Sequence, residues 1–298
     1  METLVQSNSG RARAAVSPPS SPWRDAWNQL KKQRIALVGL GVILLFILLG
    51  ILAPLLTPYS WDQGKLSDRL ISPNSHHWLG TDDLGRDLLT RILYGARISI
   101  WVGFSSVAGS IVVGTVLGLI AGYFGSVTDT VISRIFDIML AFPSILLAIA
   151  IVTILGPGLS NALIAIAIVN IPTYGRLVRS KVLSVKEEEY IVAAKVIGMN
   201  HTRIIFYHVL PNSIAPVIVQ GTLGIATAVL EAAALGFLGL GAQPPQPEWG
   251  KMIADSKDYL TNAYWTVLFP GLAIAFTVLG FNLFGDGLRD ALDPKMKQ

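Results

Sequence analysis

The stretch Ile35–Leu56, IALVGLGVILLFILLGILAPLL, contains 22 consecutive residues without a charged side chain. A helix needs about 20 apolar residues to cross the roughly 30 Å hydrocarbon layer of a bilayer. Basic residues collect on the cytoplasmic side of a membrane, and three precede this run (Lys31, Lys32 and Arg34). The sequence therefore predicts a first transmembrane helix over 35–56 that follows a cytoplasmic tail over 1–34. A cleaved signal peptide is disfavoured because the run is too long and Pro54 spoils the cleavage pattern.

The composition of the whole chain also indicates a membrane protein. Its 298 residues are 52% hydrophobic and only 14% charged, and the mean hydropathy is +0.56. Soluble domains usually carry about 25% charged residues. The chain has no cysteine, which excludes disulfides, thiolate catalysis and cysteine-ligated metal sites. The net charge of +4 is interpreted as a sign of membrane topology rather than of nucleic-acid binding, because lysine and arginine gather in cytoplasmic loops.

Five further apolar stretches are predicted to span the membrane, and they cover 98–124, 135–155, 162–178, 214–240 and 265–284. With six spans, both ends of the chain lie in the cytoplasm, together with the basic loop 179–212 and a short tail over 291–298. Segments 57–97 and 242–264 then lie outside. Three arginines just before the second span contradict this charge pattern (Arg86, Arg91 and Arg97).

Two of these spans contain glycine or proline at positions that affect how the helices pack or bend. In the second span, Gly114 and Gly118 have the G-x-x-x-G spacing that lets helix backbones approach closely in lipid. Packing within the chain is the simpler interpretation, and a dedicated dimer face is the alternative. Pro143 interrupts the third span.

The segment EEEYIVAAKVIGMNHTRIIFYHVLP over 187–211 is the most informative polar region. Ser184 and Glu187 have the spacing of a capping box, so a helix is predicted to start there. Gly198 ends that helix as a left-handed cap would, and Asn200 caps a second helix that Pro211 stops. Each helix has one apolar face at helical spacing, with Tyr190, Ile191, Ala194 and Ile197 in the first and Ile204, Ile205, His208 and Val209 in the second. Lipid headgroups or a groove on a partner protein would cover these faces, and the pattern alone leaves both open.

Two runs in this region resemble the "EAA loop" of ABC-importer permeases. They are AAKVIG over 193–198 and HVLP over 208–211, separated by nine residues. The family pattern has Glu-Ala-Ala, three residues, glycine, nine residues, and then an aliphatic residue, any residue, leucine and proline. Both alanines, the glycine, the leucine and the proline match, whereas Val192 replaces the glutamate and His208 the aliphatic residue.

Four other motifs are similar to the "C" permease subunits of the dipeptide, oligopeptide and glutathione branch of this family. They are LGTDDLGRD (79–87), FLGLGAQPP (237–245), PEWG (247–250) and GDGLRDALDP (285–294). The resemblance covers nearly the whole chain. It implies an all-α integral membrane protein with six transmembrane helices and the type I ABC-importer permease fold, with a permease core over 98–290 and a coupling loop over 184–211.

The resemblance also implies how the loop acts and which partners it needs. The loop would dock in a groove of a cytoplasmic ATPase subunit. The implied coupling residues are Glu188, Ala193, Ala194, Gly198, His208, Leu210 and Pro211. The complex would contain a second homologous permease, two ATPase subunits that bind ATP and Mg²⁺, and an external substrate-binding protein, all at a cell membrane and in contact with its lipid. No nucleic acid and no cofactor of this chain's own are expected.

The implied function is that of a permease subunit rather than an enzyme. No G-x-x-x-x-G-K-[ST] phosphate loop occurs in the sequence, so ATP hydrolysis would belong to the partner subunits. No catalytic constellation is apparent either. The branch carries dipeptides, oligopeptides or glutathione, and an importer of nickel complexes with the same fold is an alternative. A secondary transporter is a further alternative, and it would be expected to pair ionisable residues at mid-membrane.

Three polar residues within the expected spans are candidates for the translocation pathway. An acidic residue in a span is costly, so Glu231 is a functional candidate for the pathway or a subunit interface. Hydrogen-bonded packing is the competing interpretation for Glu231, and also for Asn170 and Asn282. A metal site is disfavoured for the acidic residues before the second span, because arginines stand nearby to pair with them (Asp82, Asp83 and Asp87).

Overall fold

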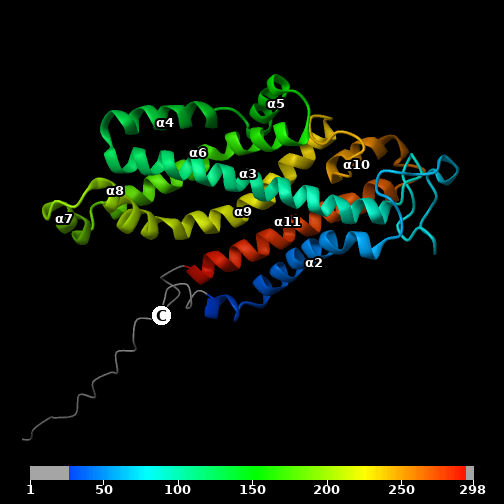
Figure 1. Ribbon diagram of the computed structural model, residues 1–298, viewed down its shortest axis with the longest axis horizontal. Helices are drawn as coiled ribbons and strands as arrows, with labels where there is room; N and C mark the ends of the chain where they lie inside the picture. The colour runs from blue at the N-terminus through cyan, green and yellow to red at the C-terminus, as the bar shows by residue number, and fades with distance from the viewer. Residues whose placement is uncertain (1–26, 293–298) are drawn as a thin grey trace, which may run out of the picture.

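The computed structural model describes residues 27–292, and over that range the chain forms a long bundle of helices (Figure 1). Five helices are long and apolar enough to cross a membrane, and a bent pair provides a sixth crossing if its two halves count as one. The five are α2 (Arg34–Leu56), α3 (Leu88–Phe124), α6 (Leu159–Val185), α9 (Leu210–Phe237) with the helical segment before it, and α11 (Trp265–Leu292). The expected all-α membrane architecture is confirmed.

The bundle has two structured ends (Figure 1). The loop end carries α7 (Glu189–Val196) and α8 (His201–Ile204), and the clasp end carries residues 57–87 and α10 (Trp249–Ser256). The start of α2 and the end of α11 lie together, since Ala36 and Ala291 share a small buried cluster. Most of the expected tails over 1–34 and 291–298 lies outside the described residues.

The glycines of α3 pack within the chain, against α6. A Cβ atom at Gly114 would lie 2.8 Å from the Ile171 carbonyl oxygen, and one at Gly118 would lie 2.5 Å from the Gly175 carbonyl oxygen. One turn later, a Cβ at Gly122 would lie 2.8 Å from the Val182 Cβ. Helices approach this closely only where small residues line the contact. The glycines therefore join α3 and α6 into one closely packed pair.

The third span differs from the range expected from the sequence. In place of one interrupted helix over 135–155, the chain forms α4 (Ser126–Leu140) and α5 (Ser144–Leu155), which meet at an angle of 94°. Pro143 is the residue before α5 and has an extended backbone, with φ −56° and ψ 131°. Proline lacks an N–H group and disfavours the helical conformation of its preceding residue, so the helix ends instead of bending gently.

The second span also begins earlier than expected. Helix α3 starts at Leu88 rather than near Ile98, so the last ten residues of the expected external loop 57–97 are helical. The Asp87 carboxylate accepts a hydrogen bond from the Thr90 backbone N–H at 2.8 Å and so caps the helix. A helix cap thus lies inside the segment expected to be a polar external loop.

Candidate functional site

The loop end begins where α6 ends, and here the capping-box prediction is wrong. Ser184 lies in the last turn of α6, and α7 starts at Glu189 without a side-chain cap from Glu188. Helix α6 continues because Val182 is fully buried against Gly122 of α3. Tertiary packing has overridden the local capping signal.

The break between α7 and α8 agrees with the sequence-based prediction. Gly198 has a φ of +77°, which is the left-handed conformation that glycine adopts without strain. The Gly198 N–H donates to the Lys195 carbonyl oxygen, and the Met199 N–H donates to that of Ala194, each at 3.0 Å. This pair of bonds is a Schellman motif and satisfies two carbonyls at the end of α7. The Asn200 side chain then caps α8 by accepting from the Thr202 N–H at 3.2 Å.

Pro211 does not stop the second helix, contrary to expectation. A π-helical turn over Ile205–Val209 joins α8 to α9, so one helix runs from His201 to Phe237 instead of starting near Ile214. A proline ring inside an α-helix clashes with the carbonyl four residues earlier, and a wider π turn just before the ring relieves that clash. The Asn212 side chain donates to the His208 carbonyl oxygen at 2.7 Å and satisfies one of the displaced groups.

The loop has a buried underside and an apolar outer surface. Its underside packs into the main core of the bundle through Ile191, Ala194, Ile204 and Val209, all at most 5% exposed. Ile197 is 77% exposed and Tyr190 is 45% exposed, so the apolar face expected to unite them with Ile191 and Ala194 is divided between the two sides of α7. The exposed large apolar residues of the outer surface are Tyr190, Val192, Val196, Ile197, Phe206 and Tyr207, and charged residues such as Lys195 and Arg203 are exposed with them. Exposed apolar residues in this number indicate a contact with a protein or a membrane.

The other residues singled out in the loop are placed around this surface. Ala193 and Gly198 are exposed, and Val192, which replaces the glutamate, is half exposed beside them. Tyr190 and His208 stack with ring centroids 6.2 Å apart. Leu210 is partly buried against the core and Pro211 is exposed, so Leu210 anchors the start of α9.

Two of the three candidate pathway residues come together inside the bundle. The Asn170 side chain on α6 donates to a Glu231 carboxylate oxygen on α9 at 3.0 Å. Glu231 is only 8% exposed. Asn282 is exposed on α11, and no hydrogen bond joins it to this pair in the described part of the chain. The pair therefore links α6 to α9.

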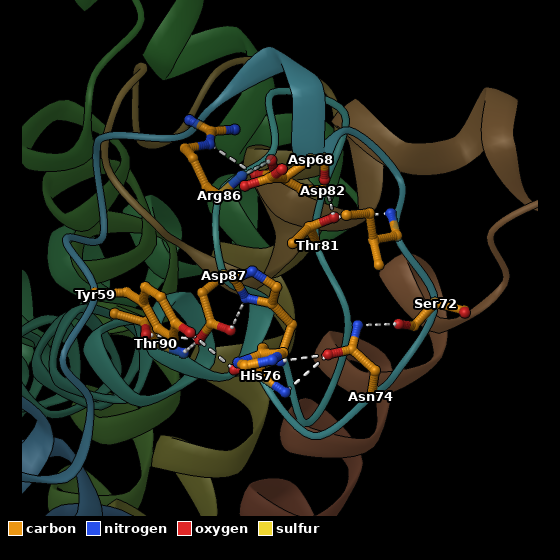
Figure 2. Close-up of polar contacts among 12 residues, drawn as sticks. Tyr59, Asp68, Ser72, Asn74, His76, Thr81, Asp82, Arg86, Asp87 and Thr90 are labelled. Carbon is orange, nitrogen blue, oxygen red and sulfur yellow. Dashed lines mark hydrogen bonds and ion pairs between the residues drawn. The ribbon is translucent and has the colours of Figure 1, made fainter.

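The LGTDDLGRD motif forms a compact clasp at the other end (Figure 2). The Asp82 carboxylate accepts from the Arg86 Nε atom at 2.7 Å and lies 3.3 Å from the Arg91 Nε atom. Figure 2 shows Asp87 beside Thr90, and its second carboxylate oxygen lies 2.9 Å from the His77 Nδ1 atom. Because Asp82 and Asp87 bond to different partners, the acidic residues act as separate acceptors instead of converging on one point.

Arg91 joins the clasp to two other segments, a role that its sequence position does not reveal. Its Nη1 atom donates to the Trp61 carbonyl oxygen at 2.7 Å and lies 3.3 Å from that of Pro245. One side chain therefore joins two segments that lie 30 and 154 positions away from it in the sequence. Arg91 is 2% exposed and Arg86 is 6% exposed, so both positive charges lie inside the protein beside the Asp82 carboxylate.

Helix α10 is fastened to α3 beside the clasp. The buried Trp249 Nε1 atom donates to the Ile92 carbonyl oxygen at 3.1 Å, and Gly95 leaves room for the indole ring. The Glu248 carboxylate caps α10 by accepting from the N–H groups of Gly250 and Lys251, each at 2.8 Å. Burial raises the pKa of Glu248 to about 7, although these two hydrogen bonds oppose the shift.

Two protein-family profiles match separate parts of the chain. The family profile described as "Binding-protein-dependent transport system inner membrane component" matches residues 114–298, and that described as "N-terminal TM domain of oligopeptide transport permease C" matches residues 21–73.

Full-length relatives are similarly informative. The dipeptide transport system permease protein DppC of Alkalihalophilus pseudofirmus is 67% identical, over 93% of this chain and 91% of its own length. The glutathione transport system permease protein GsiD of Pectobacterium atrosepticum is 46% identical, over 93% of this chain and 92% of its own. Among solved structures, an inward-facing MetNI methionine ABC transporter chain matches with a TM-score of 0.54 and 20% identity, over 68% of this chain and 96% of its own. That likeness concerns the fold.

Proposed function

Because the chain belongs to the family of binding-protein-dependent transport system inner membrane components, we propose that it is the permease subunit of an ATP-driven importer of di- and oligopeptides. The observation that carries this proposal is the loop around Gly198, with its packed underside and its apolar outer surface. Such a surface offers a partner a shallow helical ridge to grip. The chain is a multi-pass membrane protein and works in a transporter complex with other subunits.

We propose that the loop end lies in the cytoplasm and docks on an ATPase subunit. Ala193 and Gly198 keep the outer surface low, so that a groove of the partner can approach the backbone. Leu210 and Pro211 fix the exit of the loop into α9. Glu188, which is exposed, and His208, which lies beside Tyr190, would contact the same partner. Two ATPase subunits would bind ATP and Mg²⁺, and neither group would be held by this chain.

We also propose which partners contact the rest of the chain and which polar residues line the translocation path. A second homologous permease would complete the translocation path, and a substrate-binding protein would dock at the clasp end. The geometry favours packing for Glu231 and Asn170, because they satisfy each other inside the bundle. Asn282, which is exposed on α11, is the better candidate for the path or the subunit interface.

Co-purification of the solubilised chain with its partners tests this function. Wild-type chain should bring down ATPase subunits, and vesicles containing the complex should accumulate a labelled dipeptide when ATP is supplied. Competition by excess oligopeptide, glutathione or a nickel complex would rank the substrate classes. If the wild-type chain is purified without any ATPase subunit, the importer function is wrong.

Gly198→Trp should insert normally but lose the ATPase subunits, because the indole would stand on the outer surface. Gly239→Trp is a matched control, since Gly239 has nearly the same φ of +76° and equally open surroundings at the opposite end of α9. The control should keep its ATPase subunits. Retention of ATPase and uptake by Gly198→Trp would exclude docking at this loop.

A further inference from the structure

Tyr123, in the last turn of α3, contacts the loop on both sides of Gly198. Its hydroxyl oxygen lies 2.8 Å from the His201 Nδ1 atom on α8, and the two rings meet edge to face with centroids 5.6 Å apart. The Lys195 Nζ atom of α7 lies over the same tyrosine ring, 5.9 Å from its centroid. One side chain from outside the loop therefore touches both of its helices.

This contact adds a side-chain connection to the backbone hydrogen bonds of the Schellman motif at Gly198. A Cβ atom added there would meet nothing within 4 Å. Helices α7 and α8 have eight and four residues, which is too short for either to be stable without tertiary contacts. Tyr123 supplies such contacts to both, and Lys186 adds a hydrogen bond from its Nζ atom to the Gly122 carbonyl oxygen at 3.3 Å.

Helix α3 is suited to pass on a displacement received at Tyr123. Its 37 residues give a rod of about 55 Å. Beside Tyr123, the close glycine contacts hold it to α6, so the two helices must move together. At its other end, Asp87 and Arg91 bind it into the clasp. The direct route from the loop into α9, by contrast, passes through the π-helical turn before Pro211.

We propose that Tyr123 is a positioning residue through which ATP-driven movement of the loop enters α3, and through α3 reaches the clasp end. The inference rests on the proposed function of the loop and names the route of its movement. Tyr123 holds α7 and α8 as one body by contacting Lys195 and His201, and its backbone belongs to α3, a continuous α-helix of 37 residues. Loss of the hydroxyl would leave docking intact and weaken transmission.

The test compares uptake with ATP hydrolysis in vesicles containing the purified complex. Tyr123→Phe keeps the ring, and with it the contact with Lys195, and removes only the hydroxyl. We expect ATP hydrolysis to persist while dipeptide uptake per ATP falls about fivefold, which corresponds to about 1 kcal/mol, a typical value for one hydrogen bond. Thr222→Val removes a hydroxyl that donates to the Ile218 carbonyl oxygen of its own helix, α9, and should leave the ratio unchanged.

His201 variants give a second, independent measurement. His201→Leu should lower the ratio as Tyr123→Phe does, whereas His201→Asn keeps a polar atom near the Nδ1 position and should restore most of it. Tyr123→Phe and His201→Leu remove the same hydrogen bond. The double variant should therefore have an uptake per ATP no lower than that of either single variant.

A wild-type ratio for Tyr123→Phe would overturn the inference. A proportional fall of uptake and hydrolysis would also overturn it, since that result indicates a role in assembly. If the wild-type complex shows no ATP-driven uptake at all, the proposed function fails and the inference fails with it.

Discussion

At the scale of single residues, Glu248 shows how burial changes chemistry at the clasp end. Its pKa of about 7 lies above the ordinary value of 4.5, because desolvation penalises the charged form. The folded state therefore binds the proton more tightly than the unfolded state, and the free energy of unfolding falls as pH rises from about 4.5 to about 7.

We expect this titration to remove up to about 3 kcal/mol of stability between pH 5 and pH 8. Glu248→Gln has no proton to lose and should flatten that dependence. Thermal unfolding of the solubilised chain across this pH range measures both effects. An unchanged slope in the variant would show that other groups cause the dependence.

Glu231 and Asn170 illustrate how a residue chosen by its cost in lipid can belong to packing. Asn170→Leu would leave the buried carboxylate of Glu231 without its donor, and we expect a loss of about 1–3 kcal/mol in the free energy of unfolding. Glu231→Gln can still bond with Asn170 and should retain both stability and uptake. If Glu231→Gln abolishes uptake without lowering stability, the charge itself serves the translocation path.

At the scale of elements, the apolar runs of the sequence predicted where helices lie, but not how they end. The left-handed cap at Gly198 and the cap by Asn200 were predictable because each is decided by a few neighbouring residues. Ser184 failed as a start signal because packing of Val182 extends α6 past it. The π turn before Pro211 and the sharp bend at Pro143 are backbone responses to proline, which a hydrophobic pattern does not encode.

A third proline, Pro54, also explains one of the three arginines that contradict the charge pattern. Pro54 in α2 has no N–H group to donate to the Gly50 carbonyl oxygen, and the Arg97 Nε atom of α3 donates to it instead. The Arg97 Nη2 atom donates to the Ile51 carbonyl oxygen at 2.8 Å. Arg97 thus joins α2 to α3 where Pro54 removes an internal hydrogen bond of α2.

Arg97→Leu should therefore destabilise the chain by about 1 kcal/mol or more, since a carbonyl in lipid loses its donor. In a Pro54→Ala background the alanine N–H returns to the Gly50 carbonyl, and the same change should cost less. Thermal unfolding of the four variants in a double-mutant cycle measures the difference. Strictly additive effects would mean that the two residues act independently.

At the scale of the whole molecule, the three arginines are reconciled with the expected orientation. Arg86 and Arg91 are buried against Asp82, and Arg97 is bonded to the backbone of α2. The lysines and arginines of the loop remain largely exposed, including Lys181, Lys195 and Arg203. Charge that is neutralised inside the protein contributes little to the preference for the cytoplasm. We therefore expect the basic residues of the loop end to set the orientation.

We therefore expect reagents outside the cell to reach the clasp end of the bundle and not the loop end. Because the chain has no cysteine, a single cysteine can be introduced and labelled with an impermeant maleimide. Ser72→Cys, exposed at the clasp end, should react from outside. In cells that produce the chain without its ATPase subunits, Val196→Cys, at an 82% exposed position on the loop, should react only after the membrane is permeabilised.

Ala148→Cys at a fully buried position should stay unlabelled in both conditions and reports on unfolding. The two exposed positions lie at opposite ends of the bundle, so a correctly inserted chain cannot expose both on one side. Labelling of Val196→Cys in intact cells would place the loop outside, where it could not meet ATP-hydrolysing subunits. Such a result would contradict the coupling function together with the orientation, because both require the loop in the cytoplasm.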